Sequence, residues 1–265
     1  MSTSPVLALP FAGVPLVLSA ANELAGYLET GAPVTKVVRN AVLTAHFGGS
    51  DADGRWSVRD AHAALELAQV LRLREQPELT LASSPAAAST CFDWLEAQLP
   101  RQSVRSEEQI ELQQFATPPR IAWRAGRAGA LAPGEMVLEP SAGTGMLELW
   151  ADKAGARLVL NEISASRREC IESVFPTASV TCHDGELIDE LLDPALRPSV
   201  VLMNPPYSHG LERGHDGRTG ARHLRSAWNR LAPGGRLVAI MPEWFDLAGL
   251  LRSARSPVAL RLDVA

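Results

Sequence analysis

The chain has 265 residues, of which 46% are hydrophobic and 21% are charged, as is ordinary for a globular protein with one substantial core and a smaller appendage. The formal net charge of -5 excludes a protein that grips nucleic acid over its whole surface, since such binding depends on Lys and Arg neutralising phosphates. Any nucleic-acid affinity must therefore be local or supplied by a partner.

The apolar stretch from Val6 to Ala21 is interrupted by Pro10 and Pro15, and no Lys or Arg precedes it. It fits neither a secretory signal nor a membrane span, so we expect a cytoplasmic protein without membrane attachment. The three cysteines are far apart and lack C-x-x-C spacing. They predict neither a disulfide nor a zinc site, and no metal is expected.

Residues 1–110 are predicted to form a small helical N-terminal region. Ser57 followed by Asp60 resembles a capping box, and the helical spacing of apolar residues after it predicts a helix that runs to about Arg74. The small residues from Ala82 to Thr90 favour a flexible connection.

Residues 111–265 change in texture to short apolar runs that alternate with helical segments, which is typical of a parallel sheet covered on both faces. Ligands of such sheets bind beyond the carboxyl ends of the strands, where the strand order reverses. The predicted strands are Met136–Leu138, Arg157–Leu160, Ser179–Cys182, Ser199–Met203 and Arg236–Ile240, and the predicted helices are Leu147–Lys153, Ser164–Val174, Glu186–Leu192 and Ala221–Leu231.

A glycine-rich turn, Glu139-Pro-Ser-Ala-Gly-Thr-Gly145, follows the first of these strands. Gly143 and Gly145 allow a sharp turn and a close approach of ligand to a helix N-terminus. A site for a nicotinamide dinucleotide would normally have a third glycine at the position of Glu148. Its absence weakens the dinucleotide-binding alternative. A tight structural turn is the other alternative.

Acidic residues follow the next two strands. Glu162 lies where a carboxylate can accept both hydrogen bonds of a ribose diol, and Asp184 lies where a carboxylate can receive an adenine amino group. Taken singly, an acidic residue in such a position is more often a strand-end group whose hydrogen bonds are made within the protein. The neighbouring His183 has no matching second ligand or nucleophile, so we interpret it as structural.

The sharpest signal is Asn204-Pro205-Pro206-Tyr207 after the apolar strand that ends at Met203. An adenine amine is a poor nucleophile, and positive charge builds on its nitrogen as the N–C bond forms. The Asn204 side-chain oxygen and the Pro205 carbonyl can accept its two hydrogens, and Tyr207 can stack on an extruded base. A proline-rich structural turn would explain the prolines but neither the asparagine nor the aromatic residue.

These segments together resemble the gamma-class amino-methyltransferases that modify adenine N6. Phe115-Ala-Thr-Pro118 resembles their amino-terminal cofactor motif, Glu139 to Gly145 their first motif, and Asn204 to Tyr207 their catalytic tetrad, in the gamma order. More narrowly, Gln114 to Phe245 is similar to the methylase-like region of bacterial strawberry-notch-type proteins. In those proteins a helicase-like region usually follows.

The resemblance implies a Rossmann-like class I methyltransferase sheet and S-adenosylmethionine as the cofactor. It also implies DNA as substrate and a helicase-like partner or domain. The implied catalytic residues are Asn204, Pro205, Pro206 and Tyr207, and the implied cofactor-binding residues are Phe115, Thr117, Glu139, Ser141, Ala142, Gly143, Gly145, Glu162, Asp184 and Asn204.

Two departures from the pattern affect these expectations. No target-recognition segment or helicase is evident, and the chain ends inside what resembles a sixth strand, Val258 to Val264, so we expect the C-terminal strands of the sheet to be incomplete. The alternatives are therefore a methyltransferase acting on protein glutamine or RNA, and a weakly active cofactor-binding module of a larger helicase assembly.

The stretch Ser208 to Arg230 is basic within an acidic chain. Its glycine-rich first half, up to Gly220, predicts a mobile loop next to the tetrad. We hypothesise that this loop meets the DNA backbone; the alternative is a solvated loop and helix face. The candidate phosphate contacts are Arg213, Arg218 and Arg222.

Overall fold

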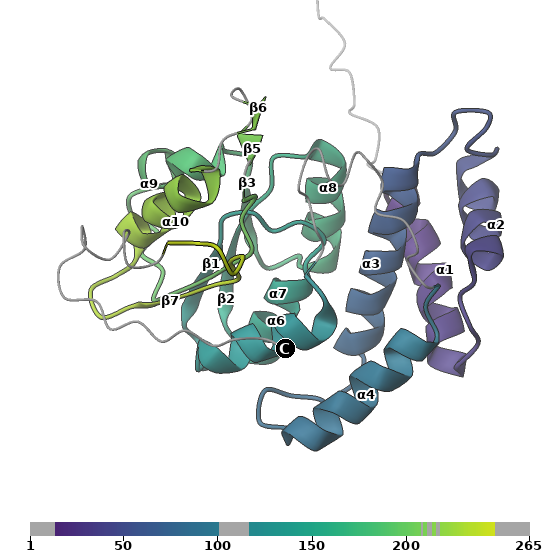
Figure 1. The fold of residues 1–265 in the computed structure, drawn as a ribbon, viewed down its shortest axis with the longest axis horizontal. Helices are drawn as coiled ribbons and strands as arrows, with labels where there is room; N and C mark the ends of the chain where they lie inside the picture. Colours follow the sequence, from purple (N-terminus) through teal and green to yellow (C-terminus); the bar gives the residue numbers. More distant parts are fainter. Residues whose placement is uncertain (1–13, 101–116, 208, 211–213, 216–217, 247–265) are drawn as a thin grey trace, which may run out of the picture.

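The computed structural model describes residues 14–100, 117–207, 209–210, 214–215 and 218–246. The N-terminal part of the described chain is helical, as predicted, and its helices lie together at one side of the molecule (Figure 1). They are α1 (Leu16–Thr30), α2 (Lys36–Phe47), α3 (Val58–Arg74) and α4 (Pro85–Ala97).

The predicted capping box starts α3. The Ser57 hydroxyl accepts a hydrogen bond from the Asp60 amide at 3.3 Å, and the Asp60 carboxylate accepts one from the Ser57 amide at 2.7 Å. Fully buried alanines line the packing of α3 on α1, and their small side chains let the two helices approach closely; they include Ala20, Ala21, Ala61, Ala64 and Ala68.

The expected flexible connection between Ala82 and Thr90 is wrong for most of its length, because α4 begins at Pro85. The Ser84 hydroxyl caps this helix by accepting a hydrogen bond from the Ala87 amide at 3.2 Å. Alanine-rich sequence has a strong helical propensity, and buried Phe92 then anchors the helix to the core.

The second part of the chain forms a five-stranded parallel sheet in the order β3-β2-β1-β4-β7. The predicted α/β class with a Rossmann-like sheet is therefore confirmed. The strands are β1 (Met136–Glu139), β2 (Arg157–Asn161), β3 (Ser179–Thr181), β4 (Val200–Met203) and β7 (Arg236–Ala239). The strand order reverses between β1 and β4, which places the expected ligand crevice beyond Glu139 and Asn204.

Helices cover both faces of the sheet (Figure 1). Strand side chains alternate between two buried clusters: Val137 and Leu202 pack toward the N-terminal helices, whereas Leu138 and Val201 pack toward Leu224. The first face carries α6 (Pro119–Ala128), α7 (Met146–Lys153) and α8 (Ala165–Val174), and the second carries α9 (Ile188–Leu191) and α10 (Thr219–Arg230).

Two predicted segments differ from the structure in detail. The helix expected at Glu186–Leu192 is a short 3₁₀ turn, Gly185–Leu187, followed by α9. The expected loop after the tetrad contains a short antiparallel pair, β5 (His209–Gly210) with β6 (Gly214–His215), and α10 begins within its last residues.

The N-terminal helices are fixed to the sheet region. Arg74 at the end of α3 forms an ion pair with Asp152 of α7 at 3.0 Å. The Lys153 ammonium donates to the carbonyls of Leu73, Arg74 and Gln76, at 3.3, 3.3 and 2.7 Å. One buried cluster runs from α1 to β4, so the packing is continuous across the expected domain boundary, which itself falls in the undescribed residues 101–116.

None of the described helices is long and apolar enough to cross a membrane. Cys91, Cys170 and Cys182 are free thiols, and within the described ranges no group of three or more His, Cys, Asp or Glu side chains is placed to hold a metal ion. The expected sixth strand, Val258 to Val264, lies outside the described residues.

Replacing Lys153 by Met should destabilise the protein by about 1–2 kcal/mol, because three carbonyls at the end of α3 lose a charged donor while the aliphatic stem is kept. Urea denaturation measures the change. The control Glu172→Gln removes a charge from a half-exposed position on α8 and should change stability by less than about 0.5 kcal/mol. Equal effects of the two variants would contradict a docking role for Lys153.

Candidate active site

The glycine turn after β1 has the sharp backbone that its sequence predicts. Gly143 and Gly145 have φ angles of +62° and +97°, in the left-handed region that favours glycine. A Cβ on Gly145 would lie 2.6 Å from Cε2 of Phe175, so a side chain there would collide with the end of α8. The turn is held from β2, since the Ala142 amide donates to the Asn161 carbonyl at 2.9 Å.

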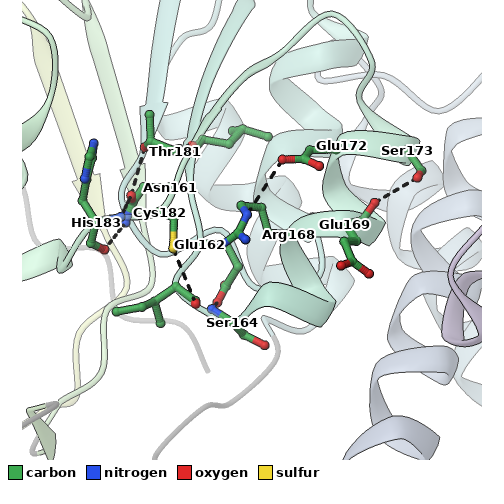
Figure 2. A network of polar contacts seen from close by, with 12 residues as sticks. Asn161, Glu162, Ser164, Arg168, Glu169, Glu172, Ser173, Thr181, Cys182 and His183 are labelled. Carbon is green, nitrogen blue, oxygen red and sulfur yellow. Dashed lines mark hydrogen bonds and ion pairs between the residues drawn. The ribbon is translucent and has the colours of Figure 1, made fainter. Parts of the chain in front are cut away.

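The buried Asn161 amide joins the turns that follow β1 and β3. Its Nδ2 donates to the carbonyls of Pro140 and His183, at 3.0 and 2.9 Å. Its Oδ1 accepts from the His183 amide at 2.8 Å and from the Thr181 hydroxyl at 2.9 Å (Figure 2). The predicted strand Arg157–Leu160 ends just before Asn161, but sequence reasoning did not identify Asn161 as the residue that ties three strand ends together.

Glu162 also holds backbone amides in place. Its Oε2 accepts from the Gly143 amide at 2.8 Å. Its Oε1 accepts from the Ser164 amide at 2.7 Å, at the start of α8 (Figure 2). A carboxylate oxygen has a second lone pair, so each oxygen can accept a further hydrogen bond. The side chain can therefore shape the glycine turn and still receive a diol.

Asp184 caps the 3₁₀ turn after β3, because its Oδ1 accepts from the Glu186 amide at 2.9 Å. A Cβ on the next residue, Gly185, would lie 3.1 Å from the Pro140 carbonyl and 2.9 Å from His223. The end of β3 is thus pressed against the turn after β1, with no room for a side chain between them.

Glu139 connects the glycine turn to the tetrad. Its Oε1 accepts from the Ser141 amide at 3.1 Å, and the Asn204 backbone amide also donates to this carboxylate. Its Oε2 is buried and has no hydrogen-bond partner. Burial and the neighbouring Glu148 carboxylate raise the pKa of Glu139 well above its usual range.

The Asn204 side chain lies in a short chain of polar contacts. Its Nδ2 donates to the Thr117 hydroxyl at 3.0 Å, and its Oδ1 accepts from the Tyr207 hydroxyl at 2.7 Å. The phenol is neutral at neutral pH and can donate, and burial raises the pKa of Tyr207 further, to about 12. Thr117, just before α6, is expected to bind cofactor, and this stays a prediction; the structure shows its hydroxyl against Asn204 of the tetrad. Phe115 lies outside the described residues.

The three expected phosphate contacts are not equivalent. Arg222 on α10 binds the Glu186 carboxylate through two nitrogens, at 2.6 and 2.9 Å, so its guanidinium already has an anionic partner within the chain. Arg218 is exposed just before α10, and Arg213 lies outside the described residues. The packing of α10 against the 3₁₀ turn brings Arg222 to Glu186, and a phosphate contact of Arg222 stays a prediction.

Sequence reasoning missed the ionisable character of Glu148, in the first turn of α7. The side chain is 2% exposed and neither carboxyl oxygen has a hydrogen-bond partner. Burial, together with the Glu162 carboxylate, raises the pKa of Glu148 to about 8. The available signal was a glutamate within the otherwise apolar run of residues 146–150.

No family model matches the chain, and no curated protein matches it. Among solved structures it is similar to TrmN from Thermus thermophilus, with 19% identity over 77% of this chain and 74% of that one and a TM-score of 0.42. A putative RNA methyltransferase from Pyrococcus horikoshii has 19% identity, 60% and 73% coverage, and a TM-score of 0.42. The glycopeptide N-methyltransferase MtfA, solved with S-adenosylmethionine, has 19% identity, 44% and 48% coverage, and a TM-score of 0.35.

Replacing Gly145 by Ala should destabilise the protein by about 2–4 kcal/mol, because the new Cβ adds a collision with Phe175 to the strain of a positive φ. Gly134→Ala is the matched control, since Gly134 has a φ of +78° and nothing within 4 Å of the position that a methyl group would take. It should cost only about 1 kcal/mol. Chemical denaturation of both variants tests the difference; equal losses would leave strain alone as the reason for glycine at position 145.

Proposed function

We propose that this chain is an S-adenosylmethionine-dependent methyltransferase that methylates the exocyclic amine of adenine in DNA. The observation that carries the proposal is the position of Asn204. Its amide begins a Pro-Pro-Tyr turn at the carboxyl end of β4, beside the point where the strand order reverses, and its backbone is tied to the glycine turn through Glu139.

The residues at the ends of β1 and β2 fit S-adenosylmethionine. The buried Glu139 Oε2 lacks a partner, which is a cost to the folded chain unless a ligand donor or cation meets it. Gly143 leaves its surroundings open, because a Cβ at this position would have only the Ser141 carbonyl near it, at 4.0 Å, so a ligand can approach the backbone closely. Glu162 would receive the ribose diol and Asp184 the adenine amine, as the resemblance implies.

The cofactor supplies an electrophilic methyl group. The chain's own task is to make an amide-like amine nucleophilic, which Asn204 Oδ1 and the Pro205 carbonyl would do by accepting its hydrogens as positive charge develops on the nitrogen. In the structure the Asn204 NH₂ group donates to the Thr117 hydroxyl, so the amide oxygen lies on the side of Tyr207. Pro206 holds the turn rigid because its ring fixes φ.

Tyr207 would stack on the base, with DNA as the favoured acceptor because of the resemblance around Thr117 and the tetrad. The exposed Arg218, together with Arg213, is the proposed phosphate contact. A helicase-like partner is proposed on the resemblance alone. Methylation of RNA or of protein glutamine, the two other acceptors of this chemistry, is decided by a transfer assay on all three substrates.

Asn204→Ala should abolish methyl transfer while S-adenosylmethionine affinity stays within a few-fold, because the removed oxygen acts mainly on the developing ammonium. Transfer from radiolabelled cofactor to DNA, RNA and total protein measures activity, and calorimetry measures affinity. The matched control is Asn229→Ala, which removes an amide on α10 that donates to Asp189. Label transferred only to RNA or protein would move the acceptor to that class.

Tyr207→Phe should keep DNA methylation within a few-fold, whereas Tyr207→Ala should weaken base binding by about 1–3 kcal/mol, seen as a raised KM for DNA, if stacking is what the ring provides. The phenylalanine keeps the aromatic face and removes the hydroxyl that now occupies Asn204 Oδ1. Steady-state kinetics separate the two. An alanine variant with wild-type kinetics would show that no base stacks on this ring.

A further inference from the structure

Two buried carboxyl groups near the glycine turn have oxygens without partners. They are Glu139 at the end of β1 and Glu148 in the first turn of α7, with 1% and 2% of their surface exposed. Three of their four carboxyl oxygens make no hydrogen bond. Buried polar groups are normally satisfied, so the pair calls for a ligand.

The two side chains lie close enough to interact. The Glu148 carboxyl affects the ionisation of Glu139 directly, and Glu162, which holds Gly143, affects both. Glu139 ends β1, and Glu148 lies in the first turn of α7, which begins directly after Gly145. The pair therefore flanks the glycine turn that belongs to the proposed cofactor site.

We propose that Glu139 and Glu148 form a carboxyl pair that holds the cationic methionine end of S-adenosylmethionine and gives up a proton when that cation binds. The proposal rests on the cofactor assignment above but not on DNA as the acceptor. The ligand carries a sulfonium and an ammonium against one carboxylate, so it brings a net positive charge to a site lined by acids.

No cation of the chain is seen to neutralise the pair within the described ranges. The helix α7 packs against α3, α6 and the sheet. Several charged groups on these elements have other partners: Glu66 of α3 accepts from the Thr144 hydroxyl, Arg74 pairs with Asp152, Lys153 binds the carbonyls of Leu73, Arg74 and Gln76, Arg120 pairs with Asp93, Arg127 donates to the Ser83 carbonyl, and Arg236 of β7 pairs with Glu135. Arg59 of α3 lines a small cavity together with Gly143 and Thr144. Arg167 of α8 acts on Glu66, and the carboxylates of Glu162 and Asp184 hold backbone amides.

The pKa shifts show how binding of the cation and release of a proton are coupled. With the pKa of Glu148 at about 8 and that of Glu139 raised, the pair retains at least one proton at neutral pH. A bound cation favours the ionised carboxylates and lowers these pKa values, so the proton leaves on binding. Affinity must then rise with pH up to about 8 and level off above it.

Calorimetry on the wild-type chain tests this with three ligands. We expect S-adenosylmethionine to release about 0.5–1 proton at pH 7.5, seen as a heat that differs between phosphate and Tris buffers, and its affinity to rise by up to about tenfold per pH unit from pH 6 to 8. 5′-Methylthioadenosine, which lacks both cationic groups, should bind without proton release. S-Adenosylhomocysteine has the ammonium but no sulfonium. Proton release on binding this ligand would assign the effect to the ammonium, and binding without proton release would assign it to the sulfonium.

Glu148→Gln should flatten the pH dependence of S-adenosylmethionine affinity and reduce that affinity about tenfold at pH 8.5, while 5′-methylthioadenosine affinity stays within about twofold. The control Glu172→Gln should behave as wild type in each measurement. If the glutamine variant keeps the wild-type proton release, or if 5′-methylthioadenosine releases as much as S-adenosylmethionine, the proposal is overturned although the cofactor assignment stands. Failure of all three ligands to bind the wild type would overturn the cofactor assignment itself.

Stability of the ligand-free chain gives a second readout, which also serves if the glutamine variant binds nothing. When folding raises the pKa of a carboxyl, the folded state holds more protons than the unfolded state between the two pKa values. The protein therefore loses stability as the pH rises from the unfolded-state pKa of Glu148 toward its folded-state pKa of about 8. We expect urea midpoints of the wild type and of Glu172→Gln to fall between pH 6 and 8.5, and that of Glu148→Gln to fall less. Equal decreases in all three would remove Glu148 as the titrating group and overturn the proposal.

Discussion

The buried amide of Asn161 is the interaction on which the rest of the site depends. Parallel strands bring their carboxyl ends to one edge of a sheet, but the turns beyond those ends are free to diverge. Asn161 prevents this by bonding the backbones of Pro140 and His183 on either side of it. Because the amide is shielded from water, losing any of these bonds would strand a polar group, which makes the arrangement all but rigid. Glu162, the next residue, extends the same function to Gly143.

Rigid placement of the turns matters because the proposed chemistry depends on orientation. Asn204 acts only if its oxygen, and not its nitrogen, faces the acceptor amine. Its backbone is held through Glu139, and its side chain contacts the hydroxyls of Thr117 and Tyr207, so the amide is positioned before any ligand arrives. Such preorganisation avoids reorganisation at the moment of reaction.

The fold was largely predictable because its signals are local. Apolar runs of four or five residues defined the strands, and the Ser57–Asp60 box defined the start of α3. The helix α4 was missed because its first residues are small and resemble a linker, and what anchors it, Phe92 against Trp123 and Trp150, is tertiary.

The site was predicted where a polar residue follows a strand, as at Glu139, Glu162 and Asn204, although their cofactor and catalytic roles stay proposals. Long-range partners were not predictable. Thr117 and Asn204 are separated by 87 residues, and nothing in the spacing connects them. The pairing of Arg222 with Glu186 depends on how α10 packs on the 3₁₀ turn. Glu148 lies inside a helix, where sequence patterns draw attention to amphipathic periodicity and not to ionisation.

The bond between the Thr144 hydroxyl and Glu66, 3.1 Å long, means that the glycine turn has a wall made by the N-terminal helices. A fragment that started at residue 111 would keep every recognised motif and yet expose the outer side of α7, including Trp150, which is fully buried in the chain. Exposed apolar surface of this kind favours aggregation. The residues that carry no motif are thus part of the smallest unit that can be expected to remain soluble, and motif boundaries are a poor guide to where this chain can be cut.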